Sequence, residues 1–97
     1  MPKAIWNHTV IAETKDYEEV EGNIYFPPQS IKKEFFKNSD THSTCPWKGV
    51  ASYYTLEVNG EINADAAWYY PEAKQEASNI TNYVAFWKGV EVIEHDT

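Results

Sequence analysis

The stretch Val50–Tyr70, VASYYTLEVNGEINADAAWYY, decides the fold. Its first part, Val50–Val58, alternates between two faces and predicts a long strand. One face carries Val50, Ser52, Tyr54, Leu56 and Val58, and the other carries Ala51, Tyr53, Thr55 and Glu57. Asn59-Gly60 favours a two-residue hairpin because both residues tolerate positive φ. Glu61–Tyr70 should therefore return antiparallel to the first strand, and Pro71 should end it.

Shorter strand-forming runs lie on both sides of this central hairpin, separated by turn residues. The runs are Ala4–Trp6, Thr9–Thr14, Tyr17–Val20, Ile24–Phe26, Asn82–Trp87 and Val90–Ile93. Turns are expected at Asn7-His8, Glu21-Gly22-Asn23 and Lys88-Gly89. Pro27-Pro28 should end the run before it. The last two runs should pair with each other as a closing hairpin.

Two segments predict short helices. A helix over Ser30–Lys37 places Ile31, Phe35 and Phe36 on one stripe. Pro71–Ile80 contains Ala, Gln and Glu, which are good helix formers. Together the patterns predict a mainly β fold, a compact antiparallel small barrel or two packed sheets, with about seven or eight strands and two short helices.

The composition is that of one folded domain. The chain has 97 residues, so we expect a single domain over residues 1–97. Hydrophobic residues make up 42% and aromatic residues 15%, which supplies a dense core and excludes a disordered chain. No apolar run approaches the roughly 18 residues of a membrane span, so no membrane partner is expected. No apolar stretch follows Met1-Pro2-Lys3, so we expect no signal peptide.

The charge argues against nucleic acid as a partner. The 15 acidic residues and 8 basic residues give a net charge of −7, and every basic residue is Lys. A phosphate backbone would be repelled, and there is no Arg to contact phosphate or guanine through paired hydrogen bonds. The acidity indicates solubility, with Glu18, Glu19 and Glu21 forming a solvated strand edge. The expected state is a monomer or a weak homodimer formed through edge strands.

The single cysteine, Cys45, cannot form an internal disulfide, which favours a reducing, cytoplasmic setting. The histidines His8, His42 and His95 lack the short spacing of zinc ligands. Neither a metal nor another cofactor is therefore expected.

The bend Thr44–Gly49, TCPWKG, is the first candidate for chemistry. It places the Cys45 thiol three residues before the Lys48 amine, and a neighbouring ammonium makes a thiol more reactive. The alternative is structural, with Cys45 as a small buried hydrophobe and Lys48 as a solvated turn residue. No His stands at a spacing that makes a Cys–His nucleophile convincing, although His42 is close in sequence.

Aromatic side chains in three short groups are the second candidate. The groups are Tyr25-Phe26, Tyr53-Tyr54 and Trp68-Tyr69-Tyr70. Strand alternation turns neighbours to opposite faces, so an outward ring can line a concave surface that suits a small ligand. The alternative is that these rings form the core of a small domain.

Several of these segments occur together in the order and spacing of a small bacterial family. They are Tyr25-Phe26-Pro27, Thr44-Cys45-Pro46 with Lys48-Gly49, Ala51-Ser52-Tyr53, Ala67-Trp68 with Tyr70-Pro71, and Phe86. From about Trp6 to Ile93 the chain resembles the domain-of-unknown-function family 427, sometimes labelled nucleotidyltransferase-like. It departs from that pattern at Gln29-Ser30, where an acidic residue is usual, and at Tyr54, where Trp is common. The resemblance implies a compact, mostly β domain whose motif residues gather around one pocket, without an established activity.

The leading hypothesis is a small-ligand-binding domain. Its expected pocket residues are Tyr25, Thr44, Cys45, Lys48, Tyr53, Trp68 and Tyr70. Lys48 would supply the charge for an anionic group, and the rings a stacking surface. One alternative is an enzyme that uses Cys45 or Lys48 as nucleophile or acid–base group, and another is a structural protein-interaction domain. Nucleotidyl transfer is discounted because the chain lacks Arg, a Gly-rich phosphate loop and paired carboxylates for Mg²⁺.

Overall fold

Residues 1–94, which the computed structural model describes, form nine strands in three antiparallel sheets. The strands are β1 (Lys3–Trp6), β2 (Thr9–Glu13), β3 (Glu18–Val20), β4 (Asn23–Tyr25), β5 (Phe36–Cys45), β6 (Gly49–Val58), β7 (Glu61–Tyr69), β8 (Val84–Phe86) and β9 (Glu91–Ile93). Three 3-10 helices accompany them, η1 (Pro28–Ser30), η2 (Lys33–Phe35) and η3 (Gln75–Ile80). The mainly β fold class is thus confirmed, with nine strands in the described residues in place of seven or eight. Among these residues no helix is long and apolar enough to cross a membrane.

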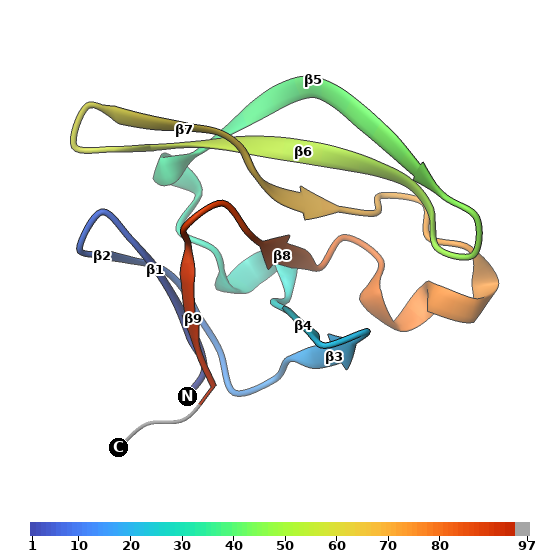
Figure 1. The fold of residues 1–97 in the computed structure, drawn as a ribbon. Coiled ribbons are helices and arrows are strands. Elements are labelled where there is room, and N and C mark those ends of the chain that lie inside the picture. The colour runs from blue at the N-terminus through green and yellow to red at the C-terminus, as the bar shows by residue number, and fades with distance from the viewer. Residues whose placement is uncertain (95–97) are drawn as a thin grey trace.

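The largest sheet is built around the predicted central hairpin and has the order β5-β6-β7-β8. Its long strands form the upper layer in Figure 1, above the sheet β2-β1-β9 and the hairpin β3-β4. Asn59 and Gly60 have φ values of 52° and 80° and place Val58 opposite Glu61. The hairpin at Asn59-Gly60 is confirmed in its turn residues and in its register.

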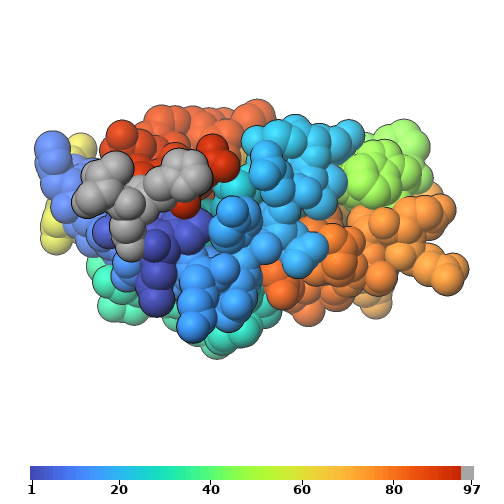
Figure 2. Space-filling view, turned by 90° about the horizontal axis from the view of Figure 1, so that it is seen from below, coloured from blue at the N-terminus to red at the C-terminus, as the bar shows by residue number. Residues whose placement is uncertain are grey.

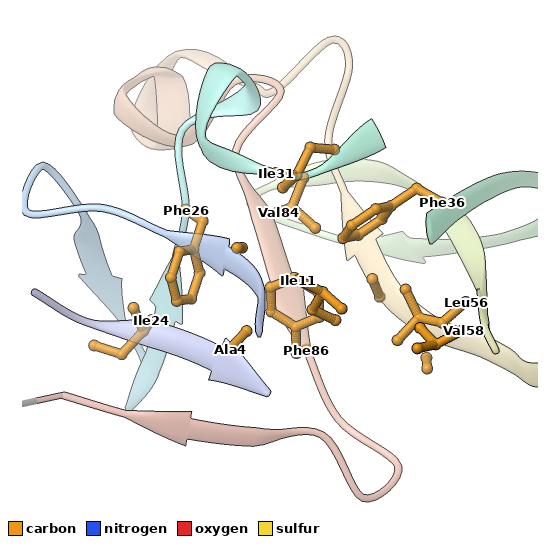
Figure 3. Packing of buried hydrophobic residues seen from close by; sticks show 13 residues of the cluster. Ala4, Ile11, Ile24, Phe26, Ile31, Phe36, Leu56, Val58, Val84 and Phe86 are labelled. Carbon is orange, nitrogen blue, oxygen red and sulfur yellow. The ribbon is translucent and has the colours of Figure 1, made fainter. Parts of the chain in front are cut away.

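Both faces of β6 are covered, each by a different buried cluster. Leu56 and Val58 belong to the larger cluster, which lies between the four-stranded sheet and the β1-β2-β9 sheet (Figure 3). In that cluster the Phe86 ring centroid lies 5.5 Å from that of Phe26 and 5.9 Å from that of Phe36. Ala51, on the opposite face of β6, belongs to a second cluster formed by Tyr25, Ala51, Tyr70, Ala77, Ile80 and Ala85. The face assignment for Val50–Val58 therefore agrees with the structure, except that Val50 is half exposed.

The helix expected over Ser30–Lys37 is wrong. The 3-10 helices η1 and η2 lie there, separated by extended backbone at Ile31, and β5 begins at Phe36. Backbone pairing with β2 explains the difference, because the Lys32 amide donates to the Ile11 carbonyl at 2.8 Å. Ile31 and Phe36 still enter the core, but from an extended chain. The expected helical turns in Pro71–Ile80 are present as η3.

The prediction that Asn82–Trp87 and Val90–Ile93 pair as a closing hairpin is also wrong. Lys88 and Gly89 form a turn with φ values of 54° and 86°, as expected, but the strands on either side of it diverge. β8 pairs with β7, and β9 pairs with β1 in another sheet. The separation follows from burial, because Val84 and Phe86 anchor β8 in the larger cluster while β9 completes the sheet beside β1.

Candidate functional site

Lys48 lies in the connection between β5 and β6, where the chain is held at several points. The Lys74 amide donates to the Lys48 carbonyl at 2.9 Å, and the Lys74 ammonium donates to the Pro46 carbonyl at 2.6 Å. Gly49 follows with a φ of 115°, and a Cβ placed there would lie 3.3 Å from the Glu72 carbonyl oxygen. The close approach of two backbone segments therefore requires glycine at this position.

The Lys48 side chain points inward rather than into solvent. Only 8% of it is exposed, and its ammonium forms an ion pair and hydrogen bond with the Glu21 carboxylate. It also lies 5.6 Å from the Tyr70 ring centroid and 5.3 Å from that of Trp47. Glu21 comes from the turn of the β3-β4 hairpin, which packs beside the β5-β6 connection and the η3 segment (Figure 2). The solvated-turn interpretation of Lys48 is therefore wrong.

A small open pocket of about 160 Å³ lies beside this ion pair, and we call it the Lys48 pocket. Its walls are formed by Lys48, Tyr53, Trp68, Tyr70 and Trp87. Tyr53 of β6 lies directly opposite Trp68 of β7 in the ladder, so both rings project from the same face of the sheet. The Trp87 ring centroid lies 5.8 Å from that of Trp68 and 6.5 Å from that of Tyr53.

The remaining predicted site residues take different positions. Tyr25 is fully buried behind the pocket, where its hydroxyl accepts a hydrogen bond of 3.2 Å from the Trp68 indole N–H. Cys45 is half buried and packs against the second cluster. Thr44 is exposed on β5 and does not line the pocket. The structure thus brings Lys48, Tyr53, Trp68 and Tyr70 together as lining residues, with Tyr25 supporting them.

Electrostatics in the Lys48 pocket are dominated by the ion pair. Burial alone would lower the pKa of the Lys48 ammonium, but the hydrogen bond to Glu21 and the nearby Tyr25 and Tyr70 oxygens raise it above its ordinary value. The hydrogen bond from Lys48 correspondingly lowers the pKa of the Glu21 carboxyl. Burial raises the pKa of Tyr70, although Lys48 opposes that shift. At neutral pH the site therefore combines the Lys48 ammonium, the adjacent Glu21 carboxylate and the neutral Tyr70 phenol.

The site offers no metal-binding geometry within residues 1–94, where no three His, Cys, Asp or Glu side chains converge. His95 and Asp96 lie outside the described residues. A scan against protein families matches residues 3–96 to the family described as a domain of unknown function, DUF427. The chain belongs to this family. A search of curated proteins finds no match.

Two residues of this DUF427 domain's candidate site are absent from the sequence-based set, Glu21 beside the Lys48 pocket and Trp87 in its wall. Glu21 was grouped with Glu18 and Glu19 as a solvated edge; it is indeed exposed, but the β3-β4 turn also brings its carboxylate into an ion pair with Lys48, which that interpretation did not include. Its only sequence signal is its place in the turn Glu21-Gly22. Trp87 follows Phe86, and strand alternation predicts that it faces away from the core that Phe86 enters.

Proposed function

We propose that this DUF427 domain binds a small ligand in the Lys48 pocket. The proposal rests on one observation. Segments that are separate in the sequence meet at one cavity, whose lining includes Lys48, Tyr53, Trp68 and Tyr70. Aromatic walls with a few polar groups are typical of ligand sites. Trp87 is 46% exposed at the rim, which supplies an open aromatic face for a ring to contact.

The charges favour an anionic ligand that displaces Glu21. The Lys48 ammonium is fixed in the wall, whereas the Glu21 side chain is 53% exposed and sits on a surface turn. An incoming carboxylate or phosphate can therefore take the place of the Glu21 carboxylate on Lys48 without moving the β5-β6 connection. A volume of about 160 Å³ lies below the range of roughly 300–1,000 Å³ for drug-sized ligands. The pocket thus suits a small anion, a single ring, or one end of a larger molecule.

A thermal-shift screen of nucleotides with Mg²⁺, small carboxylates and aromatic acids tests the proposal. A ligand at 100 times its dissociation constant adds about 2.7 kcal/mol of stability, which raises the melting temperature by roughly 10 °C in a domain of this size. We expect at least one anion to give such a shift and Lys48→Gln to abolish it. Lys37→Gln is the matched control, since Lys37 is exposed and paired with Glu57 on the surface.

Retention of the ligand shift in Lys48→Gln would overturn the proposal, as would equal losses in Lys48→Gln and Lys37→Gln. A nucleotide hit that depends on Lys48 would identify phosphate as the anion and bring nucleotidyl chemistry back into consideration. No shift with any compound would favour the protein-interaction alternative, for which exposed Trp47, Val50 and Trp87 offer apolar contacts.

The enzyme alternative has weaker support. An amine nucleophile must lose its proton, and the Glu21 ion pair holds Lys48 protonated. Cys45 is then the remaining candidate nucleophile, and it is half buried against the second cluster. The single cysteine also supports the proposal of a reducing, cytoplasmic setting.

A further inference from the structure

A second cavity opens on the opposite face of the four-stranded sheet and is much larger than the Lys48 pocket. It has a volume of about 380 Å³, against about 160 Å³ for the Lys48 pocket. We call it the tyrosine cavity, and the lining residues that matter here are Lys33, Phe36, Asn38, Tyr54, Tyr69 and Asn82. Its volume falls within the usual range for small-molecule sites.

The wall of the tyrosine cavity is a stacked pair of rings. The centroids of Tyr54 on β6 and Tyr69 on β7 lie 4.5 Å apart, with an angle of 19° between the ring planes. The Phe36 ring meets Tyr54 edge-on at 5.4 Å, which fixes the stack from one side. Both tyrosines are partly buried and pack against the larger core cluster. In a stack of this kind the inner ring faces are turned to each other, and the outer face of a ring is the surface on which a flat ligand can extend the stack.

The amide and ammonium groups that line the cavity have no partner among the described residues. Within residues 1–94, the side-chain amides of Asn38 and Asn82 make no hydrogen bond, and Lys33 forms no ion pair. Each amide offers a donor and an acceptor to a ligand. Asn82 adopts a φ of 64°, in the left-handed region that Asn tolerates better than most residues.

The charge of the lining contrasts with that of the whole chain. Although the chain has a net charge of −7, no lining residue of the tyrosine cavity is acidic, and Lys33 is the one charged residue among them. Burial, reinforced by neighbouring Tyr69, raises the pKa of Tyr54, so this hydroxyl stays neutral and can donate. The lining of this cavity is therefore neutral to positive, although the molecule as a whole carries a net negative charge.

We propose that the tyrosine cavity is a second binding site, distinct from the Lys48 pocket, for a flat aromatic molecule that carries an anionic group. The ring packs against the Tyr54–Tyr69 wall, the edges of the molecule bond with the amides of Asn38 and Asn82, and the anion pairs with Lys33. The proposal does not depend on ligand binding in the Lys48 pocket.

Titration of ¹⁵N-labelled protein with 2-naphthoate, and separately with 2-naphthamide, tests this site by NMR. Saturable shifts are expected at the Asn38 and Asn82 side-chain amides and at the Tyr54 and Tyr69 backbone amides. The indole N–H signals of Trp68 and Trp87 report separately on the Lys48 pocket, since no Trp lines the tyrosine cavity, and any shift there should saturate independently of the shifts at Asn38 and Asn82.

Variants then assign the contacts. Lys33→Gln should weaken 2-naphthoate binding about two- to fivefold, as expected for an exposed ion pair, and leave 2-naphthamide binding unchanged. Lys32→Gln is the matched control, because Lys32 is the neighbouring exposed lysine and does not line the cavity. Asn82→Gly keeps the backbone able to adopt positive φ and should weaken both probes by about threefold.

Three outcomes would overturn the proposal. Shifts confined to the Trp68 and Trp87 indoles would place the ring in the Lys48 pocket instead. Equal effects of Lys33→Gln and Lys32→Gln would show that only the general field of the surface acts on the probe. Absence of saturable shifts with both probes would show that the cavity does not take flat aromatic molecules.

Discussion

Glu21 and Lys48 titrate as a pair, and each shifts the other in the direction that favours the charged form. Removing an ammonium from water costs several kcal/mol unless a carboxylate or other groups compensate it. Here the compensation comes from Glu21 and from the faces of Tyr70 and Trp47. Stability and ligand access are therefore linked at this pair, since a ligand that takes Lys48 must replace what Glu21 supplies.

Glu21→Gln should change how stability depends on pH. The pKa of Glu21 is lower in the folded state, so its contribution is present above the unfolded value and lost as pH falls through the folded value. Lys48 has a raised pKa, so its contribution is present below its unfolded value and persists through the neutral and mildly alkaline range. Urea unfolding between about pH 3 and pH 6 should show a shallower acid decline in Glu21→Gln than in the wild type.

Glu19→Gln is the control for that experiment, because Glu19 is exposed on the same hairpin. It should retain the wild-type acid decline. Identical pH profiles for Glu21→Gln and Glu19→Gln would contradict the role assigned to the ion pair.

At the scale of elements, tight turns define the hairpins that bring the site together. Gly49 and Gly60 both have positive φ, but only Gly49 also faces another backbone segment, with the Glu72 carbonyl 3.3 Å from a Cβ placed there. Gly60 has open space around the same position. The β5-β6 connection, which carries Lys48, is thus more sterically constrained than the Asn59-Gly60 turn.

Gly49→Ala should therefore destabilise the protein more than Gly60→Ala. Both substitutions incur the cost of positive φ, about 1 kcal/mol, and Gly49→Ala adds a clash that the backbone must relieve, for a total of about 2–3 kcal/mol. Chemical denaturation of the two variants in parallel measures the difference. Equal losses of unfolding free energy would show that the close approach to Glu72 has no energetic consequence.

The elements that sequence predicts well are those with local causes. Asn7-His8 and Asn59-Gly60 mark hairpins because their residues tolerate positive φ, and both turns occur. The prediction of a helix over Ser30–Lys37 fails because the spacing of apolar residues carries no information about a distant backbone partner. In the structure the Lys32 amide donates to the Ile11 carbonyl, which keeps this segment extended. The strand β5 is not predicted from the sequence, because most of its residues are exposed and polar and therefore show no alternation of apolar and polar side chains.

The residues of the candidate site also divide into those that local sequence patterns predict and those that only distant contacts bring together. Family motifs and strand alternation predict Lys48, Tyr53, Trp68 and Tyr70, which do line one pocket. Glu21 reaches Lys48 only because the β3-β4 hairpin packs against the β5-β6 connection. No local sequence pattern predicts such a contact. The tyrosine cavity depends on how η1, η2 and the segment before β8 lie over the sheet, so its lining was not predicted either.

Across the whole molecule, Phe86 joins the parts of the larger core. It comes from β8, and its ring meets Phe26 after β4 and Phe36 at the start of β5. It is 7% exposed, so truncation would leave a buried cavity. A core of this kind in a chain of 97 residues supports a total stability on the order of 5–15 kcal/mol.

Phe86→Ala should cost about 3–5 kcal/mol, a large part of that total. Phe86→Leu, which retains more of the volume, should lose clearly less. Calorimetry or urea unfolding of the two variants gives the comparison. A loss below about 1 kcal/mol in Phe86→Ala would contradict the central place of this ring in the core.

The pairing of β1 with β9 sets Lys3 opposite Ile93, almost the full length of the chain apart. During synthesis on the ribosome, β1 and β2 emerge before the other strands of residues 1–94, and β9 emerges after them. Until then β1 keeps one unpaired edge, which is the kind of surface on which nascent chains associate with one another. The β2-β1-β9 sheet can therefore be completed only after translation has passed Ile93, which makes its closure a late event of folding.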